Sequence, residues 1–528
     1  MGVGQIAMIH QPAAPRMKIP SLSFAVLFAL QGTLTAADWP HYRGPEGDGS
    51  SSEPIRTDWA VRSPRVVWKR AIDPAWSSVT VSGGKVFTQV NRSVGGQRRE
   101  LCVALDSASG AELWSADLDA AFYPDGGTGS TDGPRSTPTV EGDRVYVLTS
   151  YLKLYCLRAD TGAVVWSRDF LAEFPGTSVI LWQNAASPLV VGDRVFLNCN
   201  VANQRLMAVQ ASDGKTLWSG QNDVMTHSSP VRATLGGIPQ VVFVTSRGTL
   251  GLSPETGDVL WRHSFAPSST SIAASPVVAN DIVYASCAYA LGAWTAKVTR
   301  SGSTFTVSQT DFKRSSAHQN HWASPVHHEG HLYSIVERSM RSLACFSLAG
   351  RTNTWITSNV GSGNPGYGSL IKVGGKLVVL TERGELVVVE PNPTAYSEIA
   401  HLQTLSGTSW NHPAFSNGKL YARSNIEIVA LDLGATASPL PPLRLAAELR
   451  QGTGRIALRV TAPGSLALSS TEASRIRLET SAIPSGGPPI WRPATLEFLA
   501  APADGTLEAE MDAPDDSILL RVAERLSQ

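Results

Sequence analysis

The sequence predicts an all-β protein, an eight-bladed β-propeller of four-stranded blades followed by a small β-rich domain. A unit of about 40–50 residues with one strand-and-turn pattern recurs along the chain, which is propeller spacing. Glycine and proline, 46 and 33 of 528 residues, suit many short strands joined by turns. Apolar residues make up 42% and charged residues 17% of the chain, which is enough for a large core.

Residues 1–37 are predicted to be a secretory signal peptide, with Met17 as an alternative start. The apolar stretch from Ile19 to Leu34 leads into Thr35-Ala36-Ala37, which has the small-residue pattern of a cleavage site. The stretch is short for a membrane span, and no later stretch reaches the required ~18–20 apolar residues. We therefore expect an exported, soluble protein, periplasmic or extracellular.

The clearest copy of the repeat shows how a blade is built. Residues 136–148 read as a strand, a Gly-Asp turn and a second strand, and residues 153–166 add a third strand, an Asp-Thr-Gly turn and a fourth strand ending at Trp166. Glycine supplies the positive φ that such turns need, and Asp caps them through the backbone. Each copy thus predicts four antiparallel strands.

The terminal tryptophans give the period and indicate how the ring closes. The spacing is 46, 52, 52 and 43 positions and then 94 across two copies, counted from Trp68, Trp114, Trp166, Trp218, Trp261 and Trp355. The fifth copy has no such tryptophan, and the eighth ends near Gly434 without its fourth strand. Residues 65–69 carry the missing strand ahead of the first copy. We predict that this strand completes the last blade and closes the ring.

The predicted domains follow from this register. Residues 38–65 form a leader segment, 66–434 the propeller, 435–442 a Pro-rich linker and 443–528 a β-rich domain, whose alternating apolar runs are typical of a small β-sandwich. The cysteines are odd in number and lie in apolar, strand-like contexts, so we expect buried side chains rather than a disulfide framework. They are Cys102, Cys156, Cys199, Cys287 and Cys345.

The outer half of the repeat resembles the PQQ-like (pyrroloquinoline-quinone-like) β-propeller family. The matching motifs are Asp160-Thr161-Gly162 with Trp166 and Glu255-Thr256-Gly257 with Trp261. The segment Trp39 to Gly49 is similar to a leader that often precedes such propellers in exported bacterial proteins. The resemblance covers about residues 38–434 and implies the fold, but the family contains quinoprotein dehydrogenases and also non-catalytic scaffolds such as the propeller lipoprotein of the outer-membrane β-barrel assembly machinery.

The enzyme class is the alternative that the resemblance leaves open. A quinoprotein alcohol dehydrogenase would need PQQ, a calcium ion held by carboxylate and amide oxygens, an Asp base, an Arg partner and an adjacent-cysteine disulfide. The sequence contains no adjacent cysteines and no Cys-x-x-Cys-His haem motif. We therefore expect a chain without catalytic residues or cofactor, and keep a PQQ- and calcium-dependent oxidoreductase as the alternative.

The repeat register predicts a ring of side chains at one mouth of the central funnel. Three positions ahead of the repeat proline position, the copies carry Trp76, Arg135, Ala185, His227, Ala273, Trp322, Tyr367 and Trp410. Asn184 and His321 each come directly before a residue of this ring, and the turns after the second strands add Arg247 and Arg383. Aromatic walls with a few polar groups are typical of a small-molecule or peptide site. The alternative is that the aromatic residues plug the funnel.

Two further features narrow the class of function. His327, His328 and His331 fall close together, but His327-His328-Glu329-Gly330 reads as a hairpin turn, so we expect no metal site. Lys+Arg and Asp+Glu both number 44, which leaves no overall field to attract nucleic acid. The sequence thus predicts an exported binding or scaffold propeller with a protein, peptide or small ligand at the funnel. A polysaccharide of the cell envelope is the other alternative partner.

Overall fold

The computed structural model describes residues 38–434 apart from 125–130, 266–271, 290 and 339, together with the backbone of strands between 444 and 524. Besides one short helix, α1 (Phe170–Glu173), the elements of these described residues are strands. The predicted signal peptide and the Pro-rich linker lie outside the described residues. No helix in the described part of the chain is long and apolar enough to cross a membrane.

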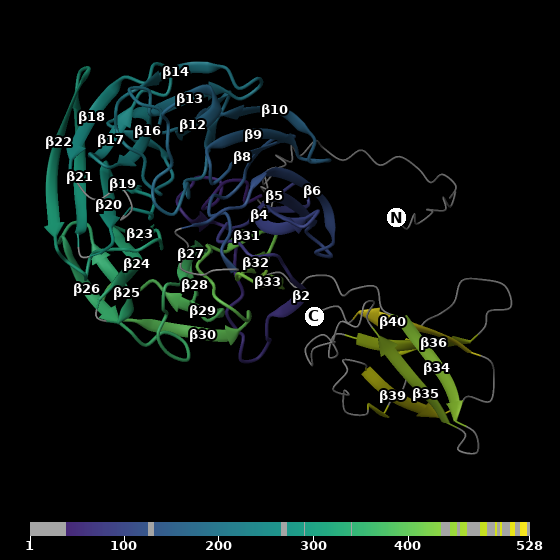
Figure 1. Cartoon of the computed structure of the whole chain (residues 1–528). Helices are drawn as coiled ribbons and strands as arrows, with labels where there is room; N and C mark the ends of the chain where they lie inside the picture. The colour runs from purple at the N-terminus through teal and green to yellow at the C-terminus, as the bar shows by residue number, and fades with distance from the viewer. Residues whose placement is uncertain are drawn as a thin grey trace, which may run out of the picture. The chain divides into compact units, whose positions relative to one another are not determined.

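Eight antiparallel blades form a ring (Figure 1), as the repeat predicts. In each blade the strands run outward from the axis in chain order, because short hairpins join them. The first four blades are β3 (Thr80–Ser82), β4 (Lys85–Val94), β5 (Gln97–Asp106) and β6 (Glu112–Ala120); β7 (Thr139–Glu141), β8 (Arg144–Leu148), β9 (Lys153–Arg158) and β10 (Val164–Asp169); β11 (Leu189–Val191), β12 (Arg194–Asn198), β13 (Leu206–Gln210) and β14 (Thr216–Gly220); and β15 (Val231–Leu235), β16 (Ile238–Thr245), β17 (Gly248–Leu252) and β18 (Val259–Ser264).

The remaining blades follow the same plan, and the fifth, which lacks the terminal tryptophan, has the longest outer hairpin of these four. They are β19 (Val277–Ala279), β20 (Ile282–Cys287), β21 (Gly292–Ser301) and β22 (Thr304–Lys313); β23 (Val326–His328), β24 (His331–Glu337), β25 (Arg341–Ser347) and β26 (Thr352–Thr357); β27 (Ser369–Val373), β28 (Lys376–Leu380), β29 (Glu385–Glu390) and β30 (Ser397–Gln403); and β31 (Ala414–Ser416), β32 (Lys419–Arg423) and β33 (Glu427–Asp432).

The N-terminal strand β2 (Arg65–Ala71) completes the eighth blade, which confirms the predicted closure. It pairs antiparallel with β33, and Arg65 lies opposite Asp432. An ion pair of 3.1 Å joins these two side chains, and a second of 3.0 Å joins Lys69 to Glu427. Figure 1 shows β2 beside β31, β32 and β33. The last blade therefore combines both ends of the propeller sequence.

Five of the terminal tryptophans connect one blade to the next. The Trp114 indole N–H donates to the carbonyl of Ala159 at 3.1 Å, and its ring covers Gly162, where an added Cβ would lie 2.5 Å from the ring. Gly162 has a φ of +73°, which favours glycine. The same bond, 2.8 to 3.0 Å long, recurs at Trp68, Trp166, Trp218 and Trp355.

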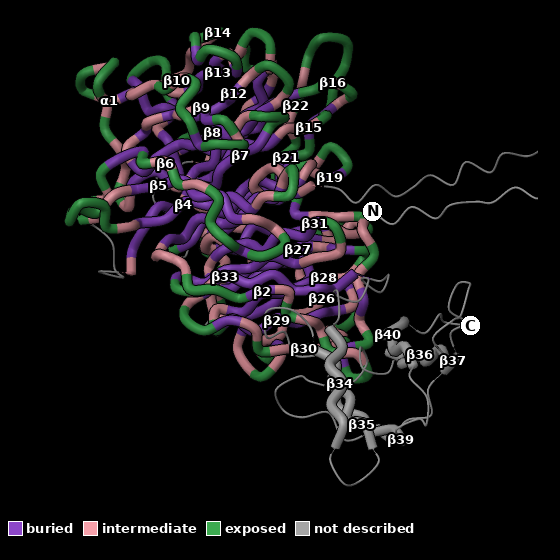
Figure 2. Tube along the Cα trace, turned by 90° about the vertical axis from the view of Figure 1, so that its right-hand side faces the viewer, coloured by how far each residue is buried: buried purple, intermediate pink, exposed green. Residues whose placement is uncertain are grey.

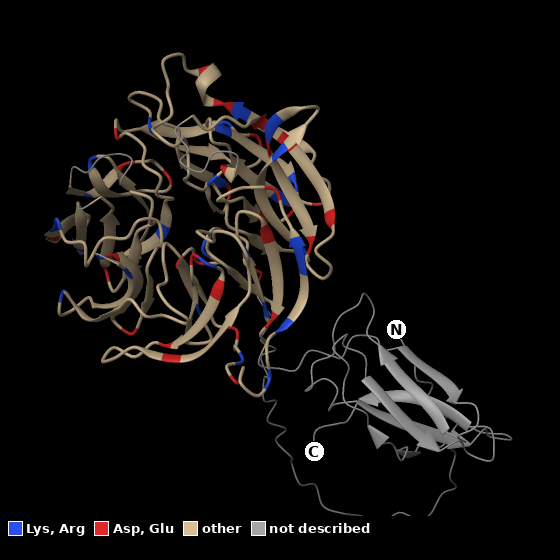
Figure 3. Cartoon of the chain, turned by 60° about the horizontal axis from the view of Figure 1, so that its bottom comes forward, with Lys and Arg blue, Asp and Glu red and all other residues tan. Residues whose placement is uncertain are grey.

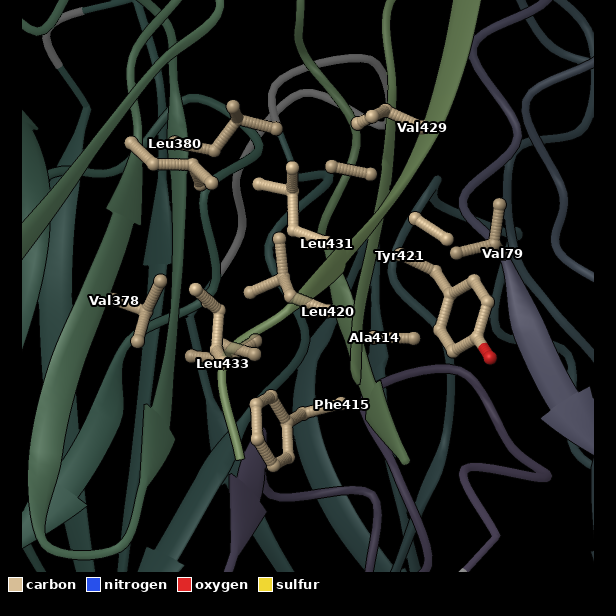
Figure 4. Packing of buried hydrophobic residues seen from close by; sticks show 14 of the residues in the cluster. Val79, Val378, Leu380, Ala414, Phe415, Leu420, Tyr421, Val429, Leu431 and Leu433 are labelled. Carbon is tan, nitrogen blue, oxygen red and sulfur yellow. The ribbon is translucent and has the colours of Figure 1, made fainter. Parts of the chain in front are cut away.

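Apolar side chains fill the space between neighbouring blades. Figure 4 shows one such cluster, in which Val378 and Leu380 of β28 approach Leu420 and Leu431 of the eighth blade. Figure 2 shows the buried residues running through the blades and the exposed ones at turns and outer strands. The five cysteines are buried free thiols within this core, as predicted.

The leader segment enters the central channel, which the sequence analysis does not predict. β1 (Ser50–Ser51) lies parallel to the innermost strand β27, so the seventh blade has five strands rather than four. Trp39 forms a bridge with Val81 of β3, and the N–H of Val140 in β7 donates to Pro40 at 2.8 Å. A single short segment thus contacts the inner strands of several blades.

Arg43 lies at the centre of this leader and is 1% exposed. Its guanidinium donates to the carbonyl of Asp48 at 2.9 Å and to the carbonyl of Pro325, which precedes β23. On another side of the ring, Arg232 of β15 donates to the Pro45 carbonyl at 3.0 Å. These partners come from blades around the axis, so the leader lies against inner strands on several sides of the channel.

The chain beyond the propeller also forms strands, and they make two sheets. The first has the order β34-β35-β39-β38 and the second β37-β36-β40, with antiparallel pairs throughout. The bounds are β34 (Arg444–Arg450), β35 (Arg455–Thr461), β36 (Ile476–Ala482), β37 (Arg492–Pro493), β38 (Glu497–Phe498), β39 (Leu507–Asp512) and β40 (Ile518–Glu524).

Candidate functional site

A cavity of about 500 Å³ lies at one mouth of the ring. The loops between blades and the turns after the second strands open on the same face, because the strands of each blade alternate in direction. The cavity is lined by residues from these loops and turns, from the starts of the inner strands and from the leader. They are Tyr42, Trp76, Ser78, Asp132, Arg135, Trp182, Ala185, His227, Ser229, Ala273, Ala288, Tyr289, His321, Trp322, Tyr367, Trp410 and His412.

The structure brings together all eight positions that the repeat register places in one ring, and His321 lies with them. The other three predicted residues lie elsewhere. Asn184 is fully buried, and its amide exchanges hydrogen bonds of 3.1 Å with the backbone of Ala186. Arg247 and Arg383 are exposed and do not line the cavity.

The wall consists of a continuous series of aromatic rings, which we call the aromatic arc. Trp76 stacks on Trp410 with ring centroids 4.2 Å apart, and Trp410 lies 4.6 Å from Trp322. Further centroid separations of 4.2, 4.9, 6.2 and 6.4 Å continue the series. The aromatic arc comprises Trp76, Trp410, Trp322, His321, Tyr289, Trp182 and His227.

The indole N–H groups of the aromatic arc donate to the protein itself. Trp410 donates to Glu382 Oε1 at 2.7 Å, and Trp322 donates to the Tyr367 carbonyl at 3.1 Å. Trp76 donates to Asp132 Oδ1 at 3.0 Å. With these donors satisfied, the three tryptophans offer a ligand their apolar surfaces.

Two carboxylates, one buried and one half-buried, hold polar members of the wall. Asp132, which is 1% exposed, accepts from Arg135 at 2.9 and 3.1 Å. Glu337 pairs with His321 Nδ1 and accepts from Gln319 at 2.7 Å. Burial acts to raise the pKa of Glu337, but the His321 hydrogen bond and charge outweigh it, so the pKa lies below its usual value. Both carboxylates are therefore fixed by specific partners.

Two buried histidines at the cavity are kept neutral. Burial, with a contribution from the positive charge of Arg135, lowers the pKa of His227 to about 4. Its Nε2 lies 2.9 Å from the Gln183 carbonyl. Burial and Arg43 lower the pKa of His412 to about 3. His412 Nδ1 lies 3.3 Å from the Tyr42 hydroxyl, so a leader residue and an inner-strand residue together contribute to the lining.

Acidification is expected to destabilise the propeller through His227. The unfolded chain takes up a proton below its usual pKa of 6.5, whereas the folded state does so only below about pH 4. The unfolded state therefore binds more protons between these values, and the free energy of unfolding falls as the pH falls through this window. Urea unfolding at pH 7, 5.5 and 4.5 measures this change in the free energy of unfolding. His227→Gln should lose less stability on acidification than the wild type, and parallel losses would contradict the assignment.

PQQ and calcium would each require particular groups in the lining of the cavity. PQQ carries several carboxylates, and calcium prefers a convergent set of oxygen ligands. Among the described residues that line the cavity, Arg135 and Asp132 are the charged side chains besides the histidines, and they pair with each other. This donor set does not fit PQQ with calcium. Elsewhere in the described ranges, no three His, Cys, Asp or Glu side chains are grouped to hold a metal ion.

Several lining residues lie outside the repeat register and were not predicted, and four of them contribute an aromatic ring or a charge. Trp182 and Tyr289 come from loops that differ between copies, so alignment of the repeats carries no signal for them. Asp132 precedes Arg135 by three positions and could have been found as its partner. Tyr42 belongs to the leader, whose entry into the channel no periodic pattern indicates.

The sequence is similar to known proteins over part of its length. A family model described as outer membrane protein assembly factor BamB matches residues 97–357. An outer membrane protein assembly factor BamB of Moranella endobia is 28% identical over 227 residues, which cover 39% of this chain and 50% of that protein. The chain thus spans about half the length of this relative.

Among solved structures, the chain is similar to BamB from Moraxella catarrhalis, with 15% identity, a TM-score of 0.47 and coverage of 71% of this chain and 99% of that chain. Quinohemoprotein alcohol dehydrogenase from Comamonas testosteroni has 12% identity and a TM-score of 0.44, with coverage of 78% of this chain and 83% of that chain.

Proposed function

Because this chain is a PQQ-like β-propeller repeat protein, we propose that it is a non-catalytic scaffold that binds a segment of a protein partner at the mouth of its ring. The observation that carries the proposal is the cavity itself. All eight blades contribute to it, its wall is the aromatic arc, and its charged residues are paired with each other. A concave, mostly apolar site with few polar groups is suited to binding.

The comparisons support a partner in the cell envelope. The matching family model and the Moranella endobia relative both carry the name of an outer membrane protein assembly factor, a role that involves other proteins. Together with the predicted signal peptide, this favours a periplasmic or extracellular location for this chain. Because the match covers about half of the relative, the identity of the partner is left to experiment.

The surface around the cavity favours a macromolecular partner over a small ligand alone. Five large apolar side chains on the loops and turns of this face are at least 42% exposed. Exposed apolar side chains around a concave apolar site extend the surface that a larger partner can contact. They are Phe122, Leu181, Tyr289, Met340 and Ile426. Figure 3 shows both signs of charge interspersed over the blades, so recognition would rest on local contacts rather than on one broad charged field.

Site-specific photo-crosslinking tests the proposed face in the native envelope. A photoreactive phenylalanine in place of Tyr289, which lies at the cavity, is expected to capture one protein partner. The same group in place of Val164, which is 53% exposed beside the turn at Gly162 on the opposite face, serves as the control. Capture at both positions alike, or at neither, would contradict the proposal. Micromolar, calcium-dependent binding of PQQ, measured by calorimetry, would also contradict the proposal.

Trp322→Ala is expected to reduce capture of the partner at least tenfold while leaving the chain folded. Trp322 is only half-buried and lines the cavity. Its truncation therefore removes surface that the partner contacts and leaves no closed cavity in the core. Urea unfolding should therefore show a loss smaller than the ~3–5 kcal/mol of a fully buried tryptophan. If the free energy of unfolding fell by that full amount and capture stayed unchanged, Trp322 would fill the funnel as a core residue and would not contact the partner.

A further inference from the structure

We propose that the cavity recognises an organic cation, the ammonium or guanidinium end of a lysine or arginine side chain. The inference rests on the proposed function, since the bound segment of the partner would present this side chain. It goes beyond that function because it names the chemical group that enters the cavity and the residues that select it.

The first argument is the orientation of the rings. The indole N–H groups of Trp76, Trp410 and Trp322 donate into the wall, so the cavity is bordered by ring surfaces rather than by N–H donors. The face of an aromatic ring carries negative potential and attracts a cation within about 6 Å of its centroid. Trp410 lies 4.2 Å from Trp76 and 4.6 Å from Trp322, so a cation at one ring of the aromatic arc has a second ring close by.

The second argument is the position of the carboxylates. Asp132, Glu382 and Glu337 each accept from the N–H edge of a ring of the aromatic arc. A carboxylate at the positive edge of a ring polarises it and makes its face more negative. The three residues thus place negative charge behind the aromatic wall without exposing a carboxylate oxygen as the main contact.

The positive charges near the site do not cancel this field. The Arg135 guanidinium is paired with Asp132 through two hydrogen bonds. Arg341 lies over the ring of Tyr367, 4.0 Å from its centroid, and is not part of the cavity lining. This contact also shows that a ring of this wall accommodates a guanidinium group. His227 is neutral at pH 7, His321 is paired with Glu337, and Glu382 takes part in none of the ion pairs of the described residues.

The third argument is room. Ala185 and Ala273 occupy ring positions that hold Trp, Tyr, Arg or His in the other blades, so the side chains at these two positions take up little of the cavity. The cavity of about 500 Å³ is large enough for a lysine or arginine end.

The experiment is a calorimetric titration of the full chain with four probes. They are Nα-acetyl-lysine amide, Nα-acetyl-arginine amide, choline and 3,3-dimethylbutan-1-ol, the neutral isostere of choline. We expect at least one amide to bind tenfold or more tightly than the neutral alcohol. Equal affinities for amides and alcohol, or no binding of any probe, would overturn the cation assignment. Choline binding without amide binding would overturn the side-chain assignment and indicate a lipid or metabolite source.

Variants place the effect in the cavity. Glu382→Gln retains an acceptor for the Trp410 indole but removes the charge, so amide affinity should fall at least threefold while alcohol affinity stays unchanged. Glu390→Gln is the control, because Glu390 pairs with Lys376 at 2.8 Å and does not line the cavity. Ala273→Trp should abolish binding by filling the cavity. Unchanged amide binding in Glu382→Gln or Ala273→Trp would overturn the proposal.

The outcomes separate this inference from the proposed function. Amide binding without a crosslinked partner would support the cation site and contradict the scaffold. Partner capture at Tyr289 without cation selectivity would leave the scaffold in place and remove the cation site.

Discussion

Trp68→Ala is expected to lower the free energy of unfolding by about 3–5 kcal/mol and to open the ring. Trp68 is 6% exposed, its indole N–H donates to Ser107 of the first blade at 3.0 Å, and its ring lies 6.1 Å from Tyr421 of the eighth. It thereby holds β2, whose pairing with β33 is what closes the ring. Loss of this contact frees the closing strand and exposes the sheet edge of β33. Urea unfolding and light scattering measure the two effects.

Trp166→Ala is the matched control for Trp68→Ala. Trp166 makes the same bond, to Ala211 at 3.0 Å, and lies at the same centroid distance of 6.1 Å from a tyrosine, Tyr146. Its strand β10 pairs with β9 of the same continuous blade, so the ring stays closed without it. We expect a smaller loss of stability and no added scattering. Equal behaviour of the two variants would show that closure depends little on β2.

Gly162→Ala is expected to cost about 2–5 kcal/mol. The positive φ of +73° accounts for about 1–2 kcal/mol of this in any residue with a Cβ. The remainder arises because the new Cβ would lie 2.5 Å from the Trp114 ring and must displace it, an overpacking cost of about 1–3 kcal/mol. Thermal and urea unfolding, with the shift in Trp fluorescence, report both effects.

Gly142→Ala separates strain from displacement. Gly142 lies in another turn of the same blade with a φ of +57°, and no atom lies within 4 Å of an added Cβ. It should therefore show the strain cost alone, about 1–2 kcal/mol, with no change in fluorescence. If both variants lose the same stability, the Trp114 contact with Gly162 contributes nothing to the joint between blades.

The propeller was predictable because one local signal is repeated. The Gly-containing turns and the terminal tryptophans report on contacts that recur at five joints, such as that of Trp114 with Gly162, so the sequence indicates the same geometry several times. Closure by residues 65–69 was predictable for the same reason, since Trp68 is a copy of the repeated tryptophan. The five cysteines needed only their apolar neighbours to be placed in the core.

The candidate site was predictable only where the repeat register extends into it. Trp76, Trp322, Tyr367 and Trp410 occupy equivalent positions at the start of inner strands, so their convergence follows from the ring. Trp182 and Tyr289 lie in loops whose course depends on contacts outside the repeat. Arg247 and Arg383 were placed at the correct turns, but the direction of a long side chain at a turn is set by local packing that the period does not encode.

The leader had no periodic signal at all. Its entry into the channel depends on a few specific contacts, such as those of Arg43 with the carbonyls of Asp48 and Pro325, and these partners are known only once the ring is built. The hairpin at His327 and His328 illustrates the opposite case, in which a local turn pattern was sufficient to place the residues.

The pairing of β2 with β33 also imposes an order on biosynthesis. Arg65 and Asp432 are separated by 367 positions, so the strand made first among the blades waits for the strand made last. Until residues 427–432 have left the ribosome, β2 has no partner and the final interface stays open. Contacts of such long sequence separation slow folding, because the loop entropy is lost before the contact forms. The nascent chain is thus exposed to proteases and to factors that bind unfolded chains for as long as its synthesis lasts.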